Sequence, residues 1–282
     1  MTLEFIARHP LGSKRPLAGF WRYFRWQIES RIRREVEFDW IEGSKLVVRN
    51  GMAGATGNIY CGLHEFTEMA FLLHLLRPDD LFIDVGANVG SYTVLASAVC
   101  GACSIAFEPD PGSAQALRRN VQCNRIERLV VVIQSALGAA TDTTRFTVGL
   151  DTMNRVASAD DKETQAVPVT TLDAQLEGKN PLFIKIDVEG HEAQVIFGAT
   201  TTLRNPSLLA LQLESVDAGV ETFLEDIGFR RAAYDPFSRR LSSVIDDSFG
   251  RGSQNTLFVR NHDIVQARLQ ASHAHDILGH LI

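Results

Sequence analysis

The sequence predicts an α/β protein built around a mainly parallel β-sheet. From residue 81 onward, short apolar runs alternate with helix-like stretches. The first apolar run, 81–85, ends in a glycine-rich turn followed by a helix-like stretch, and the second ends in an acidic residue. Strands that alternate with helices form parallel sheets covered on both faces, because each helix crosses the sheet to reach the next strand.

The composition is that of a globular protein with one large domain, or one domain with appendages, in 282 residues. The net charge of −6 disfavours nucleic-acid binding, which usually needs a basic surface. No apolar run approaches the ~20 residues that span a bilayer, and charged residues interrupt any secretory signal near the N-terminus. We therefore expect a cytoplasmic location.

Residues 1–57 are expected to form an extension of a basic helix and a β-hairpin. Phe20, Phe24 and Ile28 recur at helical spacing among arginines, which predicts an amphipathic helix near 17–34. The favoured interpretation is a helix docked on the main domain with arginines at its rim. The alternative is that residues 1–35 contact a glycosyltransferase partner or lipid at the inner face of the membrane.

The expected elements follow in order along the chain. Residues 36–60 read as short strands, including 37–41 and 45–48 around the turn signal 42–44, and a helix at 67–76 stops at Pro78. Further strands are expected at 81–85, 104–108, 129–134, 182–187, 208–213, 228–233 and 256–260. Further helices are expected at 90–99, 111–123, 190–203 and 217–227. These elements place the main domain at 58–260.

Two segments interrupt or follow this alternation. Residues 139–170 form an insertion expected to face the substrate, with strands at 144–148 and 166–169 and a mobile loop near 151–165. The tail 261–282 is expected to end in a helix, with His273, His275 and His280 on a solvated face rather than in a metal site.

The cysteine pair Cys100 and Cys103 has C-x-x-C spacing but falls between an expected helix and strand. No second such pair or paired histidines lie nearby, so buried apolar thiols are favoured over a zinc or redox site.

The turn from Asp84 to Gly90 is the most informative motif. The turn follows a strand and precedes a helix and a second strand, which ends in the acidic residue Glu108. This order is the layout of a nucleotide-binding unit, in which the acidic residue suits the ribose hydroxyls. The pyrophosphate fingerprint G-x-G-x-x-G is absent, and Asp84 stands two residues before Gly86. A carboxylate there repels pyrophosphate and attracts a cationic amino-acid head group, which favours S-adenosylmethionine over NAD.

Ligands of open parallel sheets bind beyond the carboxyl ends of the strands. The residues at the five strand ends are Asp84, Gly86, Asn88 and Gly90; Glu108, Pro109 and Asp110; Gln134, Ser135 and Ala136; Lys185, Asp187, Glu189 and His191; and Glu214. Small residues after the third strand would let an adenine ring lie flat.

The segment 185–192 alternates ionisable and apolar residues. Extended backbone would place Lys185, Asp187 and Glu189 on one face. Buried charge is costly unless it is paired, so this pattern indicates a site, with a structural ion pair of Lys185 as the alternative. His191 could be a general base, a substrate contact or only the first helical residue.

These motifs together resemble the FkbM family, a branch of the class I S-adenosylmethionine-dependent methyltransferases. The matching segments are 62–73, 82–90, 106–109, 135–138, 171–173 and 184–192, and the resemblance covers residues 58–215. It implies a Rossmann-like sheet of seven strands with an antiparallel last strand, and O-methylation of a sugar or polyketide hydroxyl. S-adenosylhomocysteine would be the product. The cofactor-binding residues are then expected to be Asp84, Gly86, Ala87, Asn88, Gly90, Glu108, Pro109, Ser135, Ala136 and Glu65.

Methyl transfer needs alignment of the acceptor oxygen and removal of its proton. Asp187 is the first candidate base and Glu189 or His191 the next, with Lys185 in the same catalytic group. Asp187, Glu189 and Glu214 could instead hold Mg²⁺ or Ca²⁺, although a divalent metal is not favoured because the sequence lacks the pattern of metal-dependent O-methyltransferases.

The sequence therefore predicts an O-methyltransferase acting on a sugar hydroxyl in glycan or glycolipid biosynthesis. The alternatives are a polyketide, macrolide or peptide acceptor, an NAD-dependent oxidoreductase, and a non-catalytic partner subunit that binds S-adenosylmethionine. The sequence leaves homo-oligomer formation open.

Overall fold

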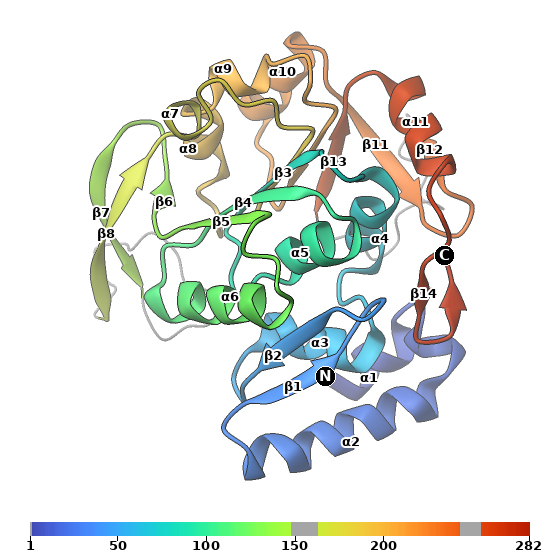
Figure 1. Cartoon of the computed structure of the whole chain (residues 1–282). Helices are drawn as coiled ribbons and strands as arrows, with labels where there is room; N and C mark the ends of the chain where they lie inside the picture. Colours follow the sequence, from blue (N-terminus) through green and yellow to red (C-terminus); the bar gives the residue numbers. More distant parts are fainter. Residues whose placement is uncertain (1, 148–162, 243–254) are drawn as a thin grey trace.

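A central mixed sheet organises the computed structural model, which describes residues 2–147, 163–242 and 255–282 (Figure 1). Most of the loop expected near 151–165 lies outside these residues. Within them the sheet has eight strands in the order β12-β11-β13-β10-β9-β3-β4-β5. Their bounds are β3 Leu81–Val85, β4 Cys103–Phe107, β5 Val130–Ile133, β9 Phe183–Ile186, β10 Ala210–Leu213, β11 Arg230–Asp235, β12 Arg240–Ser242 and β13 Thr256–Val259.

The strand directions confirm the expected fold class. Strands β5, β4, β3, β9 and β10 are parallel, and β13 lies antiparallel between β10 and β11. The edge strand β12 is an eighth strand, which pairs antiparallel with β11. The strand order reverses between β3 and β9, and ligands of such sheets bind at this switch point.

Helices cover both faces of the sheet. Helices α4, α11 and the π-turn η2 pack with Phe82 and Phe183, while α7 to α10 pack with Ile83 and Ile184 on the other face. The bounds are α4 Phe66–Leu75, α5 Ser91–Val94, η2 Leu95–Val99, α6 Pro111–Cys123, α7 Leu172–Gln175, α8 Glu192–Phe197, α9 Thr200–Leu203, α10 Ala218–Asp226 and α11 His262–Gln270. The helix expected at 190–203 is two helices, α8 and α9, which break at Gly198 where the backbone lies against Gly138.

The N-terminal extension shares a core with the sheet domain. Ile6, Trp26 and Tyr60 pack with Val89 and Val94. The elements are α1 Thr2–Arg8, η1 Gly12–Lys14, α2 Pro16–Ile32, β1 Val36–Asp39, β2 Lys45–Val48 and α3 Ala53–Cys61. The reading of 36–60 as strands is wrong for α3, whose glycines and threonine give a weak local helix signal.

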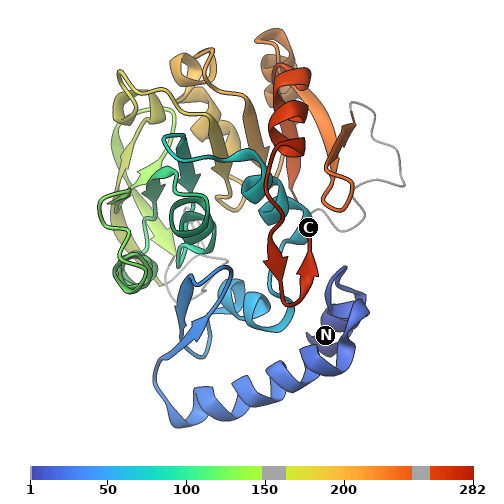
Figure 2. The same ribbon diagram turned by 45° about the vertical axis from the view of Figure 1, so that its right-hand side comes forward.

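Helix α2 docks on the domain, but through a different face from the one that its spacing indicated. Trp26 and Gly19 are buried, whereas Phe24 and Ile28 are exposed. Figure 2 shows α2 at the outer edge of the molecule. A helix with apolar residues all round does not itself determine which side packs inward.

The insertion forms a separate three-stranded sheet in the order β6-β8-β7. Its strands are β6 Ala136–Leu137, β7 Asp142–Thr147 and β8 Thr164–Thr170. Both strands expected in the insertion are thus present in its described parts.

The four cysteines are free, and burial raises the pKa of Cys61 and Cys100 to about 12, so the thiols of these two are unreactive.

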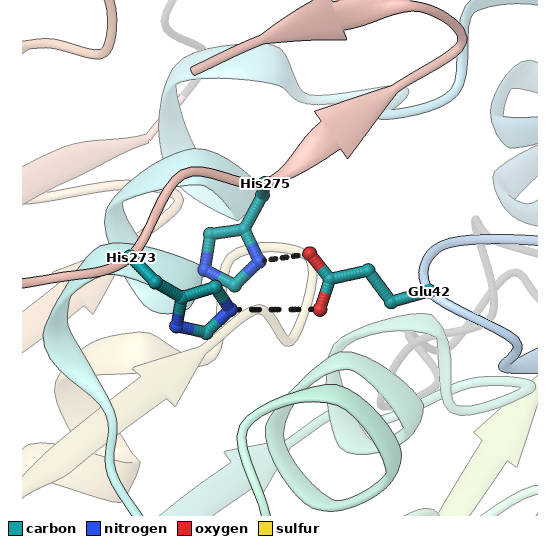
Figure 3. A group of neighbouring side chains, drawn as sticks. All are labelled: Glu42, His273 and His275. Atoms are coloured by element: carbon teal, nitrogen blue, oxygen red, sulfur yellow. Dashed lines mark hydrogen bonds and ion pairs between the residues drawn. The ribbon is translucent and has the colours of Figure 1, made fainter.

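The C-terminal tail begins, rather than ends, with its helix, α11. A hairpin of β14 Asp276–Ile277 and β15 His280–Leu281 follows. The expectation of solvated histidines is wrong for His275, which is fully buried. His275 and His273 both point toward Glu42 (Figure 3). His275 Nδ1 lies 2.8 Å from Glu42 Oε1, and the exposed His273 Nε2 lies 3.6 Å from Glu42 Oε2. The 2.8 Å separation is that of a hydrogen bond, which ties the tail to the β1–β2 turn.

The burial of His9 is expected to make the stability of the fold depend on pH. Its Nε2 lies 2.7 Å from the Leu63 carbonyl, and its Nδ1 accepts hydrogen bonds from the backbone of Leu11 and Gly12, so the ring is held neutral. Burial lowers its pKa from 6.5 to about 4. The buried neutral ring therefore stabilises the fold at pH values above the unfolded-state pKa of 6.5. This contribution to the free energy of unfolding is lost as the pH falls from 6.5 toward the folded-state pKa of about 4.

We expect the urea midpoint of unfolding to be lower at about pH 5 than at about pH 7. The variant His9→Gln should show a smaller difference between its midpoints at these two pH values. The buried His74, whose pKa burial lowers to about 3, adds a residual dependence. His262→Gln, at a partly exposed ring, is the control. An unchanged pH dependence in His9→Gln would contradict the assignment.

Candidate active site

The glycine turn after β3 lies directly against the end of β9. Gly86 has a φ of +76°, and a Cβ there would lie 1.8 Å from the Asp187 carbonyl oxygen. Backbone bonds fix the contact, because Gly86 and Ala87 donate to Phe107 and Asp187 donates to Val85. Only glycine fits this position, so the turn and the segment 187–190 form one unit.

Glu108, at the end of β4, is buried beside this turn. Its two carboxylate oxygens accept hydrogen bonds from the backbone of Asn88 and Asp110, each at 2.8 Å. Burial raises its pKa to about 7. A buried carboxylate held by two backbone donors has lone pairs left for further donors, such as a pair of hydroxyls.

Lys185 and Asp187 form a close ion pair at the end of β9. Lys185 Nζ is 2.6 Å from Asp187 Oδ2 and 4.6 Å from the centroid of the Tyr92 ring. Burial opposes the charge of Lys185, but Asp187, Glu65 and Asp84 outweigh it and raise its pKa. Lys185 therefore stays protonated and orients Asp187, and it cannot accept a proton.

Glu214, at the end of β10, completes a carboxylate pair with Asp187. Burial and then the charge of Asp187 raise the pKa of Glu214 to about 8. Burial acts in the same direction on Asp187, but Lys185 outweighs it and lowers the pKa. The pair therefore favours a proton on Glu214 and a negative charge on Asp187.

Glu192 holds the turn between β9 and α8 in place. Its Oε1 accepts from the backbone of Val188 and Gly190, and its Oε2 accepts from the Ser215 hydroxyl at 2.5 Å. This anchoring supports Glu189, whose φ of +52° is unusual for a residue with a side chain. The chain's own hydrogen bonds therefore hold the conformation of this turn.

Asp84 and Glu65 line the region between the turn and Lys185. Asp84 is buried, which raises its pKa, and it accepts a hydrogen bond from the Thr93 hydroxyl at 2.6 Å. Glu65 accepts from the Tyr92 hydroxyl. Both are near enough to Lys185 to raise its pKa, so this region holds a compact set of charges.

One cavity of about 630 Å³ brings these groups together. This volume lies in the ~300–1,000 Å³ range of small-molecule sites. Its walls include every expected site residue except Gly90: Glu65, Asp84, Gly86, Ala87, Asn88, Glu108, Pro109, Ser135, Ala136, Lys185, Asp187, Glu189 and His191. Gly90 is the N-cap residue of α5 and packs against Leu117 of α6, where an added Cβ would lie 2.1 Å from the Leu117 side chain. The roles of these residues stay predictions.

Several lining residues were missed at the sequence level. Tyr92, in the first turn of α5 after the glycine turn, is one of them. Glu214 was expected at a strand end and as a metal ligand, but its role as the partner of Asp187 was not predicted. Thr2, Phe5, Tyr23 and Gln27 of the N-terminal helices also line the cavity, and no local pattern indicates this.

The residues fit a nucleoside with a charged amino-acid head group. The turn at Gly86 brings backbone to the cavity wall, the buried Glu108 retains acceptor capacity, and acids lie farther along the wall. In the described parts of the chain, two side-chain groups have the composition of a metal site: Asp187, Glu189 and Glu214 in the cavity, and Glu42, His273 and His275 outside it.

The mixed sheet and the cavity at its switch point agree with the family that the motifs indicated. The FkbM methyltransferase domain matches residues 84–231, just over half of the chain. The chain belongs to this family, as its motifs indicated.

Two curated relatives and one solved structure are similar to this chain. The hexuronic acid methyltransferase AglP of Haloferax volcanii is 26% identical over 153 residues, which are 53% of this chain and 61% of that protein. The ribosomal protein L11 methyltransferase of Chloroflexus aurantiacus is 26% identical over 130 residues, 43% of this chain and 38% of that protein. The chain thus matches less than two thirds of either relative. The solved precorrin-6Y C5,15-methyltransferase of Geobacter metallireducens has a TM-score of 0.38 at 16% identity, covering 70% of this chain and 87% of that one.

Proposed function

We propose that this protein transfers a methyl group from S-adenosylmethionine to a hydroxyl group of a sugar. The observation that carries the proposal is one cavity with a buried acid beside the glycine turn, Glu108, and a carboxylate pair, Asp187 and Glu214. Glu108 suits the ribose of a nucleoside, and the carboxylate pair suits removal of a proton from the acceptor hydroxyl.

S-adenosylmethionine supplies a methyl group already activated on a sulfonium. The chain must hold it, exclude water and align the acceptor oxygen, and alignment can supply up to roughly 7–11 kcal/mol. Glu108 would hold the ribose hydroxyls, while Asp84 and the backbone at 86–88 would hold the amino-acid part. Asp187, oriented by Lys185, would take the hydroxyl proton as the new O–CH₃ bond forms and the S–CH₃ bond breaks.

The sugar acceptor is supported by the relative named as a hexuronic acid methyltransferase. The cavity adds a physical argument, since the aromatic residues Phe5, Tyr23, Tyr60 and Phe146 line it together with the polar Gln27. Aromatic rings with polar neighbours suit a molecule with C–H faces and hydroxyl edges. The polyketide and peptide acceptors are the competing outcomes of an acceptor panel, and the family match favours methyl transfer over the oxidoreductase alternative.

Calorimetric titration with S-adenosylhomocysteine, beside NAD⁺, tests the cofactor. We expect S-adenosylhomocysteine to bind, Glu108→Ala to weaken binding at least about tenfold through loss of charged acceptors, and exposed Glu127→Ala to leave it unchanged. Because the pKa of Glu108 is raised to about 7, affinity should fall from pH 8 to pH 6 as the carboxylate is protonated. Binding of NAD⁺ alone would overturn the proposal.

A further inference from the structure

Helix α2 presents a continuous apolar stripe to solvent. The exposed fractions are 81% for Leu17, 69% for Trp21, 53% for Phe24, 62% for Ile28 and 77% for Ile32. Residues three and four apart lie on one side of a helix, so these five side chains form a single stripe along its length. We call this stripe the outer face of α2.

The opposite side of α2 already holds the helix on the domain. Trp26 is buried, Gly19 packs against Ile6, and the Arg22 guanidinium donates to the Tyr60 carbonyl at 2.6 and 2.9 Å. The opposite side of α2 therefore makes the contacts with this domain, and the outer face is left exposed. Apolar stripes of this size on a protein surface mark interaction sites.

The charge around this helix differs in sign from the rest of the chain. Residues 1–35 hold eight basic and three acidic residues, a net charge of +5. The whole chain has 28 basic and 34 acidic residues, so the remainder holds 20 basic and 31 acidic residues, a net charge of −11. Arg25 and Arg31 follow Phe24 and Ile28 by one and three positions and thus lie beside the stripe. The exposed Arg33 and Arg34 directly follow the end of the helix at Ile32.

We propose that the outer face of α2 binds in the plane of an anionic membrane surface. Trp21, Phe24 and the aliphatic residues would enter the interface between headgroups and acyl chains, and the arginines would face anionic headgroups. In the described residues no helix is long and apolar enough to cross a bilayer, so this contact would be peripheral.

A second copy of this chain is a less suitable occupant. Pairing two outer faces would bring two segments of charge +5 together, whereas an anionic surface neutralises them. The attachment would also serve the proposed function, on which this consequence rests. Tyr23 and Gln27 of the same helix line the cavity, so a membrane on the outer face would lie about one helix diameter, ~10 Å, from the cavity wall and would bring lipid-linked acceptors near the site.

Vesicle flotation with the full chain tests the proposal. We expect binding to vesicles of phosphatidylcholine mixed with phosphatidylserine, and much weaker binding to phosphatidylcholine alone. The variant Trp21→Ser with Ile28→Ser should reduce the bound fraction at least about tenfold, because it removes two large apolar anchors. The matched control, Phe197→Ser with Ile264→Ser, removes two side chains of 57% and 51% exposure elsewhere and should bind as the parent does.

Each variant is also checked for its melting temperature and for S-adenosylhomocysteine binding, which depend on the fold and the cofactor site rather than on the outer face. Equal flotation of parent and Trp21→Ser, Ile28→Ser protein would overturn the proposal, as would no flotation of the parent. A parent dimer by light scattering that the same variant converts to a monomer, without vesicle binding, would assign the face to a second copy. Vesicle binding without S-adenosylhomocysteine binding would reject the proposed function and leave the membrane contact standing.

Discussion

Replacing Asp187 by asparagine is expected to lower the rate of methyl transfer by about 10²–10⁴-fold, the contribution of a well-placed general base. Asparagine keeps the shape of the side chain and cannot accept the proton of the acceptor hydroxyl. Affinity for S-adenosylhomocysteine should change little, since the nucleoside region at Glu108 is separate from the Asp187–Lys185 pair. Single-turnover rates with a saturating sugar acceptor measure the effect.

Neighbouring variants separate the base from its surroundings. Removing the charge of Asp187 leaves Lys185 buried at 3% exposure, so the melting temperature of Asp187→Asn must be compared with the parent. Glu214→Gln should cause a smaller loss, because Glu214 is already protonated near neutral pH. If Asp187→Asn retains the parent rate while His191→Asn or Glu189→Gln does not, the base has been assigned to the wrong residue.

Gly86→Ala is expected to abolish binding of S-adenosylhomocysteine and to destabilise the fold. A non-glycine residue in an unfavourable backbone conformation costs about 1–3 kcal/mol, and Gly86 has a φ of +76°. The added Cβ would also lie 1.8 Å from the Asp187 carbonyl oxygen, so either the glycine turn or the segment 187–190 must move. Both carry expected site residues, so the loss should appear in calorimetry and in the urea midpoint.

Gly178→Ala separates backbone strain from steric overlap. Gly178 has a similar φ of +72°, but a Cβ there would meet nothing within 4 Å. Its variant should lose only the stability due to backbone strain and should bind S-adenosylhomocysteine normally. Equal effects of the two substitutions would mean that the contact between the turn and β9 does not shape the site.

The sequence indicated which candidate residues lie together better than it indicated how they interact. The strand-end argument placed Asp84, Glu108 and Asp187 in one crevice, and all three line the same cavity. It did not indicate that Glu214 would share a proton with Asp187, because that depends on the packing of β10 beside β9. It raised an ion pair of Lys185 only as an alternative, and the structure pairs Lys185 with Asp187.

The same contrast holds for the fold. By itself the sequence determined the alternation of strands and helices, the glycine turn and the acid at the end of β4, because hydrophobic period and turn chemistry are local properties. Only the tertiary structure decided that α3 is helical, that His275 is buried against Glu42, that N-terminal side chains line the cavity, and that α2 packs through Trp26. These outcomes depend on contacts between segments distant in sequence, such as 38 residues between Arg22 and Tyr60 and 233 between Glu42 and His275. No local pattern encodes which of two apolar helix faces finds its partner.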